Sequence, residues 1–197
     1  MLQEFVGQVE ETIQNMLNEV HTALPGKILS FSPEQNTAVI KPIGTIVMPD
    51  GKRLAYPELT EVPILFPFCS SAKVGMAFPV QQGDFCLIIL SEIELDEWRS
   101  GATSEASLRF DLTSAIAIPG LLQSGSDLVS KACRQNAVVL GAGEKEIEIS
   151  ESGIICRGDL KIEGNLTCSG EVKAGKIGLQ NHTHQSAQPG QSSSPPQ

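Results

Sequence analysis

The sequence predicts a mainly β protein in which one helix precedes a small closed β-barrel and a slender β shaft. Three observations predict this class. After residue 25, short β-rich runs are broken by Pro and Gly. Towards the other end, Gly158, Gly164 and Gly170 recur every six residues. Aromatic residues make up only 5% of the 197 residues, which favours thin layers of Val, Ile and Leu over a wide core packed around rings.

Residues 1–24 are predicted to form an N-terminal helix. Their apolar side chains fall at positions 2, 5, 6, 9, 13, 16, 17 and 20, which is helical spacing with one apolar stripe. Pro25-Gly26 is expected to end this helix. Two interpretations stay open, since the stripe suits packing on the helix's own domain and docking on a partner subunit equally well.

Residues 25–120 are predicted to form the barrel. The runs "GKILSF" and "NTAVIKPIGTIV" are β-rich, and "SPEQN" between them is typical of a hairpin turn. The runs "VPILFPF" and "FPVQQGDFCLIIL" follow, and "RFDLTSAIAIPG" brings the chain back, so the barrel is expected to end near Gly120. Residues 99–107 are polar and indicate an exposed loop, and residues 121–136 show no clear period and indicate a connector.

Residues 137–180 are predicted to form a shaft. Apolar and polar residues alternate there, and the units GDLKIE, GNLTCS and GEVKAG repeat. A six-residue unit cannot cover its own apolar row, and a single-chain β-helix needs about three or more coils. The repeat therefore favours a homotrimer in which three chains wrap into an intertwined β-prism. A β-meander packed on the barrel remains the alternative.

Two of the three histidines, His182 and His184, lie just after the shaft in residues 181–197. Residues i and i+2 of a strand share a face, so three chains would bring six imidazoles together as two stacked rings. Six nitrogen ligands suit Fe(II) or Ni(II) better than tetrahedral Zn(II), and a saturated cage would be structural. The alternative is that this HxH pair binds nothing.

Charge and cysteine content narrow the class of protein. The net charge of −9 disfavours nucleic-acid binding. Five widely spaced cysteines without a CxxC pair predict reduced, buried thiols in a protein made in a cytosol. A signal peptide is not visible, and the longest apolar runs are too short to cross a bilayer.

The motifs of common enzymes are missing from the sequence, which predicts that the protein is not an enzyme. GxSxG, P-loop and HExxH patterns do not occur. Two groups of carboxylates are interpreted as solvated surface, and they comprise Glu144, Glu146, Glu148 and Glu151, and Glu92, Glu94, Asp96 and Glu97.

Taken in order, these segments resemble a known family. The stretch "LPGKILSFSPEQNTAVIKP", the barrel runs quoted above, the glycine-rich alternating stretch and "HTHQSAQPG" resemble the membrane-piercing central spike of contractile phage tails, in its short, lysozyme-free form. The likeness covers roughly residues 20–195, although the shaft of about 40 residues is short.

The resemblance implies a homotrimer with an oligonucleotide/oligosaccharide-binding (OB) fold collar, a triple-stranded β-helix and one iron ion per trimer, held at the apex by His182 and His184 of each chain. It also implies attachment to a baseplate hub protein, a place at the baseplate tip of the virion, and puncture of the host outer membrane during cell entry. A phage-like injection device would use the same parts. The alternatives are a trimer like the hexapeptide-repeat acyltransferases and a glycan-binding trimeric adhesin or tail fibre tip.

Overall fold

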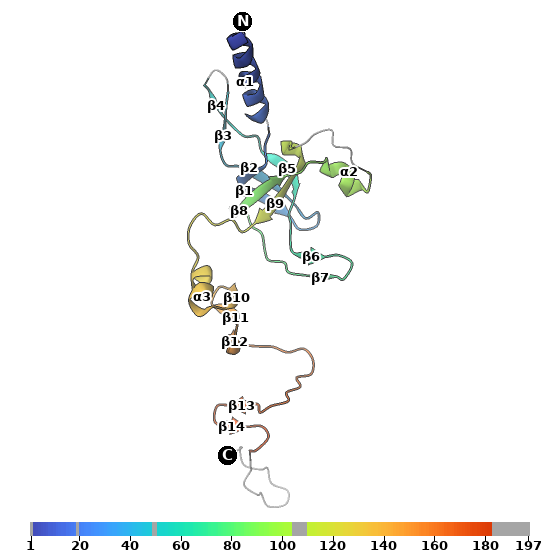
Figure 1. Ribbon diagram of the computed structural model, residues 1–197. Coiled ribbons are helices and arrows are strands. Elements are labelled where there is room, and N and C mark those ends of the chain that lie inside the picture. Colours follow the sequence, from blue (N-terminus) through green and yellow to red (C-terminus); the bar gives the residue numbers. More distant parts are fainter. Residues whose placement is uncertain (1, 19, 49–50, 104–109, 183–197) are drawn as a thin grey trace, which may run out of the picture. The chain divides into compact units, whose positions relative to one another are not determined.

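The computed structural model describes residues 2–18, 20–48, 51–103 and 110–182 (Figure 1). The chain divides into two compact units, Met1–Ser126 and Asp127–Gln197. It is mainly β with a short N-terminal helix, which confirms that part of the predicted fold class. None of the described helices is long and apolar enough to cross a membrane.

The N-terminal helix α1 spans Leu2–Asn18. It ends well before Pro25, the position at which the sequence predicts that the helix stops. Pro25 and Gly26 instead lie inside the first strand. Its apolar stripe is exposed, with Phe5, Met16 and Leu17 each more than 60% accessible. The stripe is therefore not buried against the rest of the described chain.

A five-stranded antiparallel sheet with the order β5-β2-β1-β8-β9 forms the centre of the first unit. Its strands are β1 (Ala23–Ser32), β2 (Thr37–Pro42), β5 (Leu59–Pro63), β8 (Phe85–Leu90) and β9 (Ala115–Pro119). The sheet curls until its two edge strands come together at one bridge between Ile64 and Ala117. The result is a half-open barrel rather than the fully closed one predicted. The predicted hairpin at residues 32–36 is present between β1 and β2.

Aliphatic side chains fill the inside of the curled sheet. Ile28, Ile40 and Ile88 are completely buried at its centre. Gly26 lies against two of them, because a Cβ at this position would come within 2.7 Å of both Ile40 Cγ2 and Ile88 Cδ1. The close approach of β1 to its neighbours therefore requires glycine at this position.

Smaller elements project from this sheet (Figure 1). They are the hairpin of β3 (Thr45–Val47) and β4 (Arg53–Ala55), the hairpin of β6 (Phe68–Cys69) and β7 (Val74–Gly75), the helix α2 (Leu95–Ser100) and the 3-10 turn η1 (Leu112–Ser114). α2 takes up the start of the predicted polar loop and ends at Gly101, whose left-handed φ of 80° suits glycine. The remainder of that loop, residues 104–109, lies outside the described residues.

The second unit begins with a helix that the sequence did not predict. α3 spans Asp127–Gln135 within the expected connector, and it has only about two turns, too few to show a clear period. A three-stranded meander follows, with β10 (Val138–Ala142), β11 (Lys145–Ser150) and β12 (Gly153–Arg157). β13 (Lys173–Ala174) and β14 (Ile177–Gly178) form a small final hairpin.

Candidate assembly surface and apex

The meander of the second unit has one mainly apolar face, with Lys145 at its edge. Register places Val138 opposite Ile149, which is opposite Ile154, and places Leu140 opposite Ile147, which is opposite Cys156. We call these six residues the apolar face. All of them are accessible to solvent in the single chain, with Ile154 68% and Val138 60% exposed. An apolar face of this kind on an antiparallel sheet normally packs against something.

The opposite face of the same meander carries three ionic side chains, Glu146, Glu148 and Arg157, beside Val139 and Ile155, and α3 packs against β10. Arg157 Nη1 donates to Glu148 Oε2 at 2.6 Å, and both Arg157 and Lys131 of α3 bond to Glu146. The hydrogen bond from Lys131, followed by that from Arg157, lowers the pKa of the Glu146 carboxyl. The same carboxylates raise the pKa of Arg157. α3 is thus engaged on this face and leaves the apolar face open.

This ion-pair group corrects the expectation that Glu146 and Glu148 belong to a solvated surface. Glu148 is only 5% exposed, and Glu146 is paired with two cations. Alternation was predicted correctly, but the covering helix with its lysine was not, so the predicted surroundings of these carboxylates were wrong.

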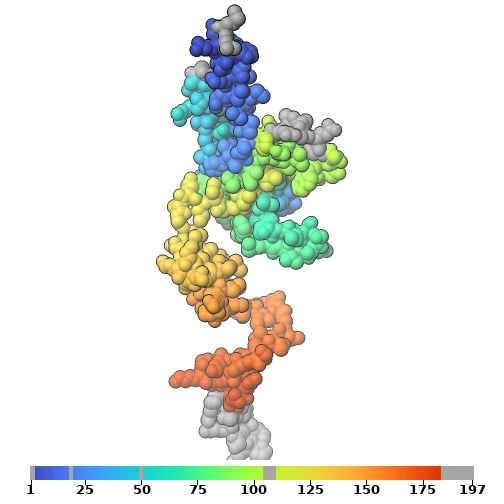
Figure 2. Space-filling view, viewed as in Figure 1, coloured from blue at the N-terminus to red at the C-terminus, as the bar shows by residue number. Residues whose placement is uncertain are grey.

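Residues 158–172 run on from the meander as an extended segment without a strand partner. The described part of the chain offers no backbone hydrogen bond to residues 159–171. Leu160, Ile162 and Leu166 in this segment are 45–69% exposed. Figure 2 shows the stretch, in orange, as a strand of atoms one chain thick. A segment with unpaired backbone groups and an uncovered apolar row has the pattern of a strand whose partners lie on other chains.

The glycines of the six-residue repeat differ in their surroundings. Gly158 has a left-handed φ of 128°, which explains its identity. Gly164 and Gly170 have no atom within 4 Å of where a Cβ would stand. The described part of one chain therefore does not require glycine at these two positions, whereas a closely approaching second chain would.

The five cysteines differ in their exposure to solvent. Cys86 is buried in the curled sheet, where desolvation raises its pKa to about 11. Cys69, Cys133, Cys156 and Cys168 are exposed in the single chain, so the prediction of buried thiols holds for Cys86 alone. Cys156 lies on the apolar face, and Cys168 lies in the extended segment.

The predicted metal ligands lie at the end of the described chain. The hairpin before them is tied down by Glu171, whose side chain accepts hydrogen bonds from the backbone of Gln180 at 3.0 Å and from Asn181 at 3.3 Å. His182 Nδ1 lies 2.9 Å from the carbonyl oxygen of Leu179. When Nδ1 donates to that carbonyl, Nε2 carries the lone pair, which is the arrangement found in most metal-binding histidines.

His184 lies outside the described residues, so the pairing of the two imidazoles stays a prediction. Within the described part of one chain, no group of three or more His, Cys, Asp or Glu side chains is placed to hold a metal. A cage shared by three chains could not form inside one chain. His21, the third histidine, packs edge-on against Tyr56 with ring centroids 5.5 Å apart.

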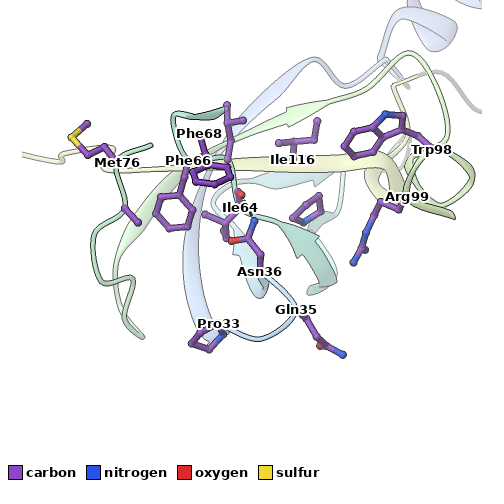
Figure 3. Close-up of a pocket in the computed structure, with 13 residues that line it drawn as sticks. Pro33, Gln35, Asn36, Ile64, Phe66, Phe68, Met76, Trp98, Arg99 and Ile116 are labelled. Atoms are coloured by element: carbon purple, nitrogen blue, oxygen red, sulfur yellow. Dashed lines mark hydrogen bonds between the residues drawn. The ribbon is translucent and has the colours of Figure 1, made fainter. Parts of the chain in front are cut away.

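A pocket of about 580 Å³ opens on the first unit (Figure 3). Trp98 and Arg99 of α2 lie at one end, and Phe66, Phe68 and Met76 lie at the other. The side chain of Asn36 is fixed between them, because its Nδ2 donates to the carbonyl oxygen of Ile64 at 2.8 Å. The described residues around this pocket include no carboxylate, thiol or imidazole. Its lining combines aromatic rings with the polar side chains of Asn36 and Arg99, a combination that suits ligand binding.

The first unit has the strand order and curvature described above between residues 23 and 119. Residues 24–120 match the family of the phage protein Gp138 N-terminal domain. A search of the curated proteins gave no match. This match supports the interpretation that the chain is a protein of a phage tail or baseplate with a structural role in the virion.

The matched range corresponds closely to the curled sheet. The matched range begins one residue into β1 and ends one residue after β9. It therefore contains the pocket but neither α1 nor the apolar face. Sequence reasoning missed the pocket, although one signal was available. The only tryptophan of the chain ends the polar stretch "SEIELDEW", whose last four residues begin α2.

Proposed function

We propose that this protein is the central spike of a contractile phage tail, or of a phage-like injection device, and that it pierces the host outer membrane as a homotrimer when the tail contracts. One observation carries the proposal: among the residues that the structure describes, the apolar face and the extended segment of the second unit have no partners in a single chain. Three copies wound around a common axis supply both the apolar contacts and the missing backbone hydrogen bonds.

A wound trimer also suits mechanical work. Strands that close around an axis leave no free edge, so a shaft made from them resists fraying under axial load. In this arrangement residues 24–120, which match the Gp138 N-terminal domain, form a collar that faces the baseplate hub. The work is structural, and the proposal includes no catalysis.

The apex requires a separate fastening, because three chain ends at the tip of a needle tend to splay. We assign this role to one iron ion per trimer, held by His182 and His184 of each chain. Support comes from the imidazole of His182, whose Nδ1 contacts a backbone carbonyl and so directs Nε2 away from the hairpin. The metal would tie the three ends together and supply no reaction.

Molar mass and iron content together test the proposal. The full chain is purified without a histidine tag, its mass is measured by light scattering, and its iron is measured by elemental analysis. We expect three chains and one iron ion per particle. The double variant His182→Ala/His184→Ala should lose the iron, whereas His21→Ala, which removes the only other histidine, should retain it. A monomer without a bound transition metal contradicts the proposal.

A glycan-binding tail tip is the second candidate, and the pocket of the first unit favours it. Carbohydrate sites use exposed aromatic rings, and Trp98 and Phe68, which line opposite ends of the pocket, are 61% and 59% exposed. Binding to a glycan array that is lost in Trp98→Ala would support this function. Unchanged binding, or no binding by the wild type, would leave the spike as the better account.

A further inference from the structure

α1 carries an apolar stripe with the spacing of a coiled coil. Its exposed apolar side chains Val6, Val9, Ile13 and Met16 follow one another at intervals of three, four and three residues. In a heptad these are successive a, d, a and d positions. The sequence continues the same spacing to Val20, just after the helix. The outward b, c and f positions hold polar residues or glycine, namely Gly7, Gln8, Glu11, Gln14 and Asn15.

The stripe is wider than the seam of a two-stranded coiled coil. Phe5 at a g position and Leu17 at an e position flank it, and they are 63% and 61% exposed. Val occurs at d as well as at a, and β-branched residues at both positions favour more than two strands. A helix of this length with Gly7 inside it is also marginal alone, so its stability must come from packing the stripe.

Charge is arranged so that copies of the helix can meet. α1 contains no Lys or Arg, and Glu4 and Glu11 lie at f positions, away from the seam. In a parallel coiled coil each g residue faces the e residue five positions later on the next chain. The pairs are then Phe5 with Glu10 and Thr12 with Leu17, so no two carboxylates face each other.

We propose that α1 forms a short parallel three-helix coiled coil with two other copies of this chain, a second trimer contact at the N-terminal end. This proposal rests on the proposed homotrimer. A stable interface buries about 800 Å² on each partner. The six half-exposed apolar side chains of this one short helix supply a smaller area. The helices therefore associate only because the trimer holds them together, at an effective concentration of the order of millimolar.

Cysteine cross-linking of the full chain tests the arrangement. Val9→Cys places a thiol at a d position in the seam, and Glu11→Cys, two residues away, places one at an f position on the outer face. The tryptic peptide Met1–Lys27 contains no native cysteine, so a disulfide-linked pair of this peptide reports only on the new thiol. After mild oxidation, we expect the linked peptide in Val9→Cys and not in Glu11→Cys.

Light scattering on the same samples distinguishes a failure of the coiled-coil proposal from a failure of the trimer proposal. A trimer in which Val9→Cys links no more than Glu11→Cys overturns the coiled coil but leaves the spike standing, and the stripe then faces another protein such as the hub. A monomer overturns both proposals. Equal, strong linking by both variants also contradicts the seam, since it indicates random collisions between helices.

Discussion

Replacing Ile154 by serine tests whether the apolar face is an interface. Complete burial of an isoleucine side chain is worth about 1.5–3 kcal/mol. Ile154 is 68% exposed in the single chain, so burying the remainder on assembly contributes roughly 1–2 kcal/mol per chain and roughly 3–6 kcal/mol per trimer. The variant should therefore raise the dissociation constant of the trimer by about 10²- to 10⁴-fold.

The assay is a dilution series followed by light scattering or analytical ultracentrifugation. Val74→Ser serves as the matched control, because Val74 on β7 is 67% exposed and lies outside the second unit. We expect the control to dissociate like the wild type and Ile154→Ser to dissociate at much higher concentration. If the two variants behave alike, the apolar face is not the surface that holds the chains together.

Three further predictions concern the curled sheet, the ion-pair group and the proposed apex. Gly26→Ala should destabilise the curled sheet by about 1–3 kcal/mol through overpacking, as measured by denaturant unfolding. Gly125→Ala is the control, because a Cβ there meets open space, and it should leave the stability unchanged. Equal stabilities of the two variants would refute the close approach at β1. Because the folded pKa of Glu146 is lowered from 4.5, the stability from its ion pairs is present above that pH and is lost as the pH falls through the folded value. Glu146→Gln should therefore flatten the acid limb of the thermal-melting profile, and an unchanged limb would contradict the role of this carboxylate. At the proposed apex, acid or a strong chelator should loosen the segment around His182 before the rest of the second unit melts, because only neutral imidazole binds the metal. Unchanged hydrogen exchange in that segment after metal removal would refute the proposed metal site.

Much of the first unit follows from local sequence rules. The β1–β2 hairpin forms where "SPEQN" predicts it, and the β-rich run "FPVQQGDFCLIIL" contains the strand Phe85–Leu90. The end of the first helix was misjudged at Pro25, because proline is tolerated in a strand wherever its missing N–H is not needed. Local rules cannot show which backbone groups a neighbouring strand will use.

The second unit was harder to predict, since its important contacts are not local. Glu146 is paired with Lys131 from a short helix, and the buried Glu148 is paired with Arg157 from the next strand. Alternation predicted which residues share a face, and the apolar face agrees with it. What covers that face depends on molecules outside the chain, and no pattern within a single sequence specifies them fully.

The uncovered apolar face has a consequence for synthesis in the host cell. A newly made chain presents accessible Val, Leu and Ile side chains beside unpaired backbone groups, a combination that invites aggregation. In the proposed trimer other copies cover this face, and the yield should then depend on how soon a chain meets them and on the local abundance of nascent chains. Slow production at low abundance would favour chaperone capture or proteolysis, while translation from clustered ribosomes would favour productive folding.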